Sequence, residues 1–275
     1  LHVGVVDDES PGEREGQIGA NFGVIVKYQA LSDLGGKYQY LVKQYLDGGK
    51  DVVLVIEFLD GGYSNLQQII DGAFDGQLNG FIDDMMSHGN QQMWIRHLHE
   101  FNGDWYPWGT YRDGNDTDTF KRAFRHVVDV FRGRGANVKF QLAYNCDNPN
   151  DDGKSFHDWY PGGDVVDMIL CSGYNRAGVD SDHTSWQSFS EVFSSGYYKM
   201  ASLDGGKPLG VAETSSTSWG GDKAQWIRDA FDAVVNQFTR VEQCNWFLIN
   251  KAGDWDLNSD SERHAFGDSL NEYSW

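Results

Sequence analysis

The sequence has little positive charge and lacks a long apolar run. It contains 22 Lys and Arg against 41 Asp and Glu, which gives a formal net charge of −19 at pH 7. This acidic balance argues against nucleic acid or an anionic membrane as a partner, because both repel a negative protein. A run of about 18 apolar residues, the length that a membrane-spanning helix needs, does not occur. A neutral polymer such as a polysaccharide is compatible with this charge.

Cysteine is scarce, and its spacing indicates no metal site. Cys146, Cys171 and Cys244 each lie in or just after an apolar, strand-like run, and we expect buried free thiols. A Cys146–Cys171 bridge between neighbouring strands is the alternative that the sequence leaves open. The acidic loops 113–118 and 147–153 lack the EF-hand spacing, so we expect solvated loops, with a structural calcium as the alternative. We therefore expect neither a metal nor a cofactor in the functional site.

The length of 275 residues suits one (β/α)8 barrel or two small domains. Short apolar runs alternate with amphipathic stretches, which is the pattern of a parallel α/β fold. The strand candidates are His2–Asp7, Phe22–Tyr28, Val52–Phe58, Met93–His99, Val138–Asn145, Val166–Ser172, Leu209–Glu213 and Cys244–Ile249. No linker, repeat or low-complexity segment interrupts them. The sequence therefore predicts a single domain over residues 1–275, with the eight strands of a TIM barrel.

Helical periodicity fills most of the gaps between these runs. The helix candidates are Lys37–Leu46, Leu66–Met86, Thr119–Arg132, Asp222–Phe238 and Ser261–Leu270. Glycines at 72, 76 and 80 interrupt the second candidate, so we expect a broken or two-part helix there. The polar, glycine-rich crossover Asp8–Asn21 gives the weakest helix signal.

The most informative stretch of the chain runs from Arg96 to Gly109. The apolar run Met93–Ile95 leads directly into charge, as a strand does when it emerges from a core. The carboxylate of Glu100 follows His99, and several aromatic residues come immediately afterwards. A carboxylate at a strand end beside Trp and Tyr is typical of an enzyme that binds sugar rings.

A second carboxylate, Glu213, ends the seventh apolar run, whereas Glu100 follows the fourth. Active sites of (β/α)8 barrels are built at the carboxyl ends of the strands, so both glutamates are expected at the same mouth. Glycoside hydrolysis requires two carboxylates that flank the scissile bond. The spacing is therefore consistent with a glycosidase.

The run Arg-x-x-His-Glu-x-Asn-Gly-x-Trp-x-x-Trp at residues 96–108 resembles the acid/base segment of glycoside hydrolase family 26. Lys207–Glu213 resembles the nucleophile strand of that family, and Gly221–Ile227 and Asp254–Trp255 also fit it. The similarity extends over most of the chain. His97 departs from the family pattern, in which Pro is common at this place. That family contains retaining endo-β-mannanases, mixed-linkage β-glucanases and β-1,3-xylanases.

This resemblance implies a role for each residue of the predicted site. Glu100 would be the acid/base and Glu213 the nucleophile, with Arg96 and the Tyr174 hydroxyl as donors to the nucleophile. His99 would contact the sugar on the non-reducing side of the bond. The aromatic residues expected to bind the substrate are Trp105 and Trp108, which would line the cleft, and Trp246, which would form a platform under the reacting sugar. Barrel packing is the alternative for Trp246, Trp255 is a weaker cleft candidate, and His97 is interpreted as structural.

The function that follows is a secreted, endo-acting, retaining glycoside hydrolase that cleaves β-1,4-mannan or glucomannan and acts as a monomer. The chain begins with Leu1 and shows no signal peptide, as we expect of a mature or trimmed form. A mixed-linkage β-glucanase (lichenase) and a β-1,3-xylanase are the alternatives within the resemblance. A non-catalytic carbohydrate-binding barrel is an alternative of a different class, and the presence of both glutamates argues against it.

Overall fold

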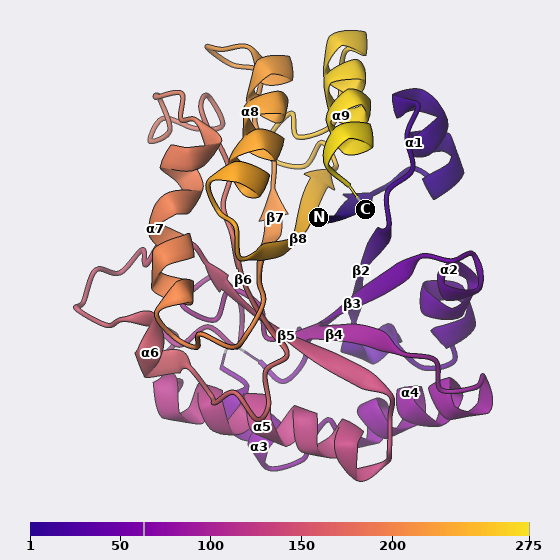
Figure 1. Cartoon of the computed structure of the whole chain (residues 1–275). Helices are drawn as coiled ribbons and strands as arrows, with labels where there is room; N and C mark the ends of the chain where they lie inside the picture. The colour runs from indigo at the N-terminus through magenta and orange to yellow at the C-terminus, as the bar shows by residue number, and fades with distance from the viewer. Residues whose placement is uncertain (63, 275) are drawn as a thin grey trace.

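In the computed structural model, which describes residues 1–62 and 64–274, eight parallel strands close into a barrel. The strands follow one another in sequence order, and β8 pairs with β1 to complete the ring. Their bounds are β1 His2–Asp7, β2 Val24–Ala30, β3 Asp51–Glu57, β4 Met93–His97, β5 Val138–Asn145, β6 Met168–Ser172, β7 Leu209–Thr214 and β8 Val241–Leu248. Helices surround this barrel (Figure 1). The predicted (β/α)8 fold is confirmed.

The crossovers between the strands carry the helices of the outer layer. The α-helices are α1 Pro11–Ile18, α2 Gln44–Asp47, α3 Leu66–Ile70, α4 Asp75–Ser87, α5 Thr117–Gly133, α6 Phe156–Trp159, α7 Phe189–Ala201, α8 Lys223–Asn236 and α9 Asp260–Tyr273. A 3₁₀ turn spans Leu31–Asp33, and a π-helix, Gln39–Lys43, runs directly into α2. The predicted helix Leu66–Met86 is broken as expected, because Gly72 adopts a left-handed φ of 79° between α3 and α4. No helix in the described ranges is long and apolar enough to cross a membrane.

Reciprocal capping explains where several helices begin. The weakly predicted α1 begins at Ser10, whose side chain accepts from the Glu13 amide while Glu13 accepts from the Ser10 amide. Helix α7 begins at Ser188 in the same way, with Glu191 as its partner. The periodicity analysis did not predict α7 or the short α6, although the Ser-x-x-Glu signal of α7 is present in the sequence.

Strand alternation divides the side chains between the inside and the outside of the barrel. The inward-facing apolar residues form two small clusters, one of Val6, Val24, Val26, Val53 and Val55 and one of Ala143, Met168, Leu170 and Ala212. The residues that alternate with them pack against the helices and form the main hydrophobic core. A polar group also lies within the barrel, and it supports the functional site described below.

Cys146 and Cys171 form a disulfide, so the expectation of free thiols is wrong for these two residues. Cys146 directly follows β5 and Cys171 belongs to β6, and the pairing of these strands leaves their Cα atoms 4.9 Å apart. This separation is within the range that a disulfide requires. Cys244 is buried and free, as expected.

Candidate active site

The chain leaves β4 through an unusual backbone turn that carries Glu100 to the carboxyl end of the barrel. Leu98 and Glu100 have left-handed φ values of 53° and 51°, which are uncommon for residues other than glycine. The Glu100 amide donates to the Ala143 carbonyl on β5 at 2.8 Å and helps to hold this conformation. Strained backbone of this kind clusters at functional sites, where the surrounding structure maintains it. The strand therefore ends at His97, two residues earlier than predicted.

Neutral donors hold both oxygens of the Glu100 carboxylate. The Trp105 Nε1 donates to Oε2 at 3.0 Å, and the Asn145 Nδ2 donates to Oε1 at 3.3 Å. Burial raises the pKa of Glu100, while hydrogen bonds from Trp105, Asn145 and Ser172 act in the opposite direction. A raised pKa favours retention of a proton near neutral pH, as a general acid requires.

Glu213 lies at the end of β7 and is 8% exposed. The Tyr174 hydroxyl donates to its Oε2 at 2.6 Å, and the Arg96 guanidinium approaches its Oε1 at 3.8 Å. Burial raises the pKa of Glu213 to about 8, whereas the hydroxyl and the guanidinium favour the ionised form. Its Oε1 accepts no hydrogen bond from any residue that the structure describes. Tyr174 therefore fixes one oxygen of Glu213, and the Arg96 guanidinium lies nearest the other.

Arg96 is fully enclosed and is held by a chain of amide groups across the barrel. Its Nε and Nη2 both donate to the Gln141 Oε1, at 3.1 and 2.9 Å. Gln141 donates to Gln243, Gln243 donates to Asn245, and Asn245 donates to the backbone of β7. Burial lowers the pKa of Arg96 to about 9, so the group remains cationic at neutral pH. This chain fixes a positive charge beside Glu213.

Trp108 does not line the barrel mouth as expected, because its side chain is fully buried. It donates to the His99 carbonyl at 2.7 Å and stacks on Tyr106, with ring centroids 4.5 Å apart. Trp108 therefore supports His99 and Tyr106 through these contacts. Trp105, in contrast, is 40% exposed and lies beside Glu100.

His99 is almost completely buried between aromatic rings. Its ring lies 4.6 Å from that of Tyr106 and 5.5 Å from that of Tyr28, measured between centroids. Both ring nitrogens lack a hydrogen-bond partner among the described residues. Burial and the charge of Arg96 lower the pKa of His99 to about 3, so the imidazole is neutral. His97 instead stacks on Phe124 of α5, which agrees with its predicted structural role.

The expected platform role of Trp246 is wrong. Alternation along β8 turns this side chain outward, where it packs against Phe231 of α8 and Phe266 of α9. Phe247 points the other way, and its ring lies 6.2 Å from that of Tyr174. The weaker candidate Trp255 is also near Tyr174, at 5.2 Å between centroids, although it is almost fully buried.

Three further residues at the barrel mouth were not predicted from the sequence. Asn145 ends β5 and donates to Glu100. Glu57 ends β3, and burial raises its pKa. Tyr106 lies where the charges of Glu100 and Glu57 both raise the pKa of its hydroxyl, in addition to burial. The position of Asn145 and Glu57 at the carboxyl ends of predicted strands was a signal that could have identified them.

The arrangement places two carboxylates with different partners around Arg96 and Tyr174. Arg96 and Tyr174 both interact electrostatically with Glu100, and both also lie close to Glu213. Such a pair suits proton transfer by one carboxylate and nucleophilic attack by the other. Within residues 1–62 and 64–274, no group of three or more His, Cys, Asp or Glu residues is placed to hold a metal ion.

The sequence is similar to one known family of proteins. The sequence profile of glycosyl hydrolase family 26 matches residues 62–208, which is more than half of the chain. The chain belongs to glycosyl hydrolase family 26. This family is the one that the sequence motifs indicated. The matched range includes Glu100 and ends shortly before Glu213.

The curated relatives of this family 26 chain carry different activities in their names. Endoglucanase H of Acetivibrio thermocellus is 41% identical over 204 residues, which cover 73% of the chain and 22% of that protein. A mannan endo-1,4-beta-mannosidase of Bacillus subtilis is 26% identical over 205 residues, which cover 72% of the chain and 49% of that protein. The chain thus spans about a fifth to a half of these relatives.

Solved structures support the family 26 fold over nearly the whole chain. A mannanase of Bacillus subtilis superposes with a TM-score of 0.65 over 95% of the chain and 82% of that structure, at 16% identity. A family 26 protein of Muricauda sp. gives a TM-score of 0.72 over 98% of the chain and 85% of that structure, at 14% identity. At these identities the likeness establishes the barrel and not the substrate.

Proposed function

We propose that this family 26 chain is an endo-acting, retaining β-glycanase in which Glu100 is the acid/base and Glu213 is the nucleophile. The observation that carries the proposal is the difference between the two carboxylates. The Glu213 carboxylate accepts from the Tyr174 hydroxyl and lies 3.8 Å from the Arg96 guanidinium, whereas the hydrogen bonds to Glu100 come from neutral indole and amide groups. The charge of Arg176 is a smaller influence on Glu100. These partners suit Glu213 to react as an anion and Glu100 to transfer a proton, and burial raises the pKa of both carboxyl groups.

The proposed reaction has two steps. Glu213 attacks the anomeric carbon through Oε1, and the bond to the leaving sugar oxygen breaks as that oxygen takes the proton of Glu100. Glu100, now ionised, then removes a proton from water. That water attacks the anomeric carbon, the bond to Glu213 breaks, and both carboxyl groups return to their initial state.

For the substrate we propose a β-linked glucan, with mixed-linkage β-1,3-1,4-glucan as the first polymer to test. Support comes from the 41% identity to Endoglucanase H, well above the 26% identity to the two relatives named mannan endo-1,4-beta-mannosidase. The β-1,4-mannan that the sequence analysis placed first is the second candidate, because two curated relatives carry that activity in their names. β-1,3-Xylan ranks third, since the xylanase relative matches only 34% of the chain.

Release of reducing ends from these three polymers tests the substrate proposal, with Glu213→Ala as the inactive control. We expect the highest kcat/KM on mixed-linkage glucan, together with an early fall in viscosity from internal cleavage. Activity confined to mannan would contradict the glucan proposal and restore the second candidate. No hydrolysis of any β-glycan would favour the non-catalytic carbohydrate-binding barrel.

Retention of configuration is a direct consequence of the two-step reaction. Proton NMR of the first product from a β-linked oligosaccharide should show the β anomer before mutarotation. Initial appearance of the α anomer would mean inversion by a single displacement, and the proposed role of Glu213 as nucleophile would be wrong.

We also propose that the protein acts outside the cytosol, as a monomer, on a polysaccharide. The Cys146–Cys171 disulfide supports this location, since such bonds persist in oxidising compartments. Secretion by the natural host can be measured by immunoblotting culture medium and cell fractions. Retention of the protein in the cytosolic fraction would contradict this part of the proposal.

A further inference from the structure

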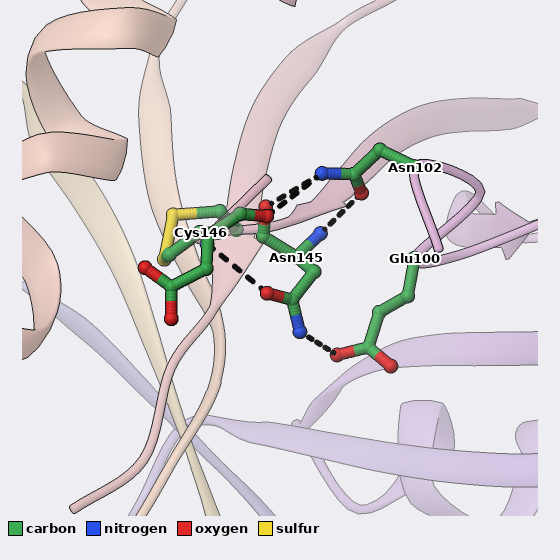
Figure 2. Close-up of a disulfide and its surroundings, with 6 residues drawn as sticks. Glu100, Asn102, Asn145 and Cys146 are labelled. Carbon is green, nitrogen blue, oxygen red and sulfur yellow. Dashed lines mark hydrogen bonds between the residues drawn. A yellow bond between two sulfur atoms is a disulfide. The ribbon is translucent and has the colours of Figure 1, made fainter. Parts of the chain in front are cut away.

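The disulfide lies next to two of the groups that hold the Glu100 carboxylate. Asn145, which donates to Glu100 Oε1, directly precedes Cys146 in the chain. Ser172, whose side chain also lowers the pKa of Glu100, directly follows Cys171. Asn145 and Ser172 are themselves paired across β5 and β6. Figure 2 shows the bridge, Asn145 and Glu100 in one continuous group.

Hydrogen bonds fix the orientation of Asn145. Its backbone amide donates to Asn102 Oδ1 at 2.8 Å, and Asn102 Nδ2 donates to the Asn145 carbonyl at 3.0 Å. Its own Oδ1 accepts from the Asp147 amide at 3.0 Å. These contacts leave Nδ2 for Glu100, as the dashed lines of Figure 2 show.

The neighbouring strand is irregular where Ser172 lies. The register between β6 and β7 shifts between Cys171 and Ser172, so that Ser172 pairs with Glu213. Such irregularities re-aim side chains and are common beside active sites. A covalent bond at Cys171 therefore restrains the strand at the residue where the ladder is interrupted.

We propose that the Cys146–Cys171 disulfide positions the acid/base, by fixing the ends of β5 and β6 so that Asn145 and Ser172 stay against Glu100. This inference rests on the proposed role of Glu100. The disulfide and Asn145 are positioning groups, since they act through Glu100 and not on the substrate.

The test compares the Cys146→Ala/Cys171→Ala double variant with the parent enzyme at a temperature where circular dichroism shows both to be folded. We expect kcat/KM to fall roughly 3- to 10-fold on polymer, the effect of weakening one or two hydrogen bonds. An aryl β-glycoside with a good leaving group should lose less than about twofold, because its departure needs no proton. The alkaline limb of the polymer pH profile should move to higher pH, since the lost donors favoured ionised Glu100.

Two further variants supply a control and a reference for the cysteine double variant. Cys244→Ala removes a buried cysteine away from the bridge and should leave the ratio of polymer to aryl activity unchanged. Asn145→Ala should reproduce the selective loss on polymer and the alkaline shift. Combined with the cysteine double variant, Asn145→Ala should have a smaller effect than it has alone, because both changes weaken the Asn145 contact to Glu100.

The outcomes separate this inference from the proposed function. Equal losses on polymer and aryl substrate, without a shift of the alkaline limb, would make the disulfide purely structural and overturn the inference. Additive effects of Asn145→Ala and the cysteine pair would overturn it too. If Glu100→Ala itself shows no selective loss on polymer in the same assay, the acid/base assignment fails instead.

Discussion

At the scale of single residues, the contacts of Glu213 determine when it can act as a nucleophile. The Tyr174→Phe variant removes the hydroxyl that donates to its Oε2 at 2.6 Å. This donor favours the ionised form, so its loss raises the pKa of Glu213 above a value that burial already raises to about 8. Activity requires ionised Glu213 and is lost as the pH falls through that pKa.

The acid limb of kcat/KM should therefore move to higher pH in Tyr174→Phe, by about 1–2 pH units if the bond contributes about 1.5–3 kcal/mol. The pH profile of the folded variant on an aryl glycoside measures this shift. An unmoved acid limb would show that Tyr174 does not control the ionisation of Glu213.

Gly103 allows Trp105 to reach Glu100. A Cβ at position 103 would lie 2.3 Å from the Trp105 indole, so Gly103→Ala must displace the ring that donates to Glu100. We expect roughly a 3- to 10-fold loss of kcat/KM on polymer, from the lost hydrogen bond. Gly133→Ala, where a Cβ meets no atom within 4 Å, is the matched control. Equal kcat/KM of the two variants on polymer would mean that the hydrogen bond from Trp105 to Glu100 does not contribute to activity.

The sequence placed some of these residues correctly and others not, for physical reasons. Glu100 and Glu213 follow strand-like runs, and strand ends meet at one mouth, so their proximity was predictable. The platform role predicted for Trp246 was wrong, because a one-residue difference in alternation decides whether a side chain faces the inside or the outside of a barrel. The prediction that Trp108 lines the cleft was wrong, because an aromatic residue close in sequence to Glu100 can pack against the site residues without being exposed to substrate.

At the scale of elements, helix α7 packs directly on the disulfide. A Cβ at Gly196 would lie 2.6 Å from Cys171 Sγ and 2.8 Å from Cys146 Cβ. Replacing glycine by alanine in a helix interior usually stabilises a protein by about 0.5–1 kcal/mol. At Gly196 the clash should outweigh this gain and destabilise the fold by about 1–3 kcal/mol.

Unfolding in urea compares Gly196→Ala with Gly80→Ala in α4, where a Cβ would meet no atom within 4 Å. Gly80→Ala should raise the free energy of unfolding, and Gly196→Ala should lower it. A gain in stability for both variants would contradict the close packing of α7 on the disulfide.

Periodicity predicted most elements because buried parallel strands and amphipathic helices have distinct patterns. It missed α7, whose capping box at Ser188 and Glu191 is nevertheless readable. It could not decide the state of Cys146 and Cys171, because the distance between their Cα atoms depends on how β5 and β6 pair. The left-handed turn at Leu98 and Glu100 has no signal in residue type, since neither residue is a glycine.

At the scale of the whole molecule, closure of the barrel assembles the site. Arg96 lies on β4, Gln141 on β5 and Gln243 on β8, yet one chain of hydrogen bonds joins them across the barrel. Gly4 on β1 makes room for this chain, because a Cβ there would lie 2.2 Å from Asn245 Oδ1. The fold class was predictable from the number of strands, but this internal polar chain emerges only when the ring closes.

The central claim, that Glu100 is the acid/base, predicts a specific kinetic pattern for Glu100→Ala. Cleavage of polymer should fall by at least roughly 10²–10⁴-fold, because the leaving sugar oxygen needs a proton. The kcat/KM for an aryl β-glycoside with a good leaving group should be largely spared. Water attack on the intermediate still needs a base, so the first turnover should appear as a burst followed by a slow steady rate.

Azide rescue of Glu100→Ala is the most direct measurement, because azide attacks the covalent intermediate without a base. Added azide should accelerate steady-state turnover of the aryl glycoside and yield a β-glycosyl azide. Equal losses on polymer and aryl glycoside, with no burst and no azide product, would contradict the assignment of Glu100 as the acid/base.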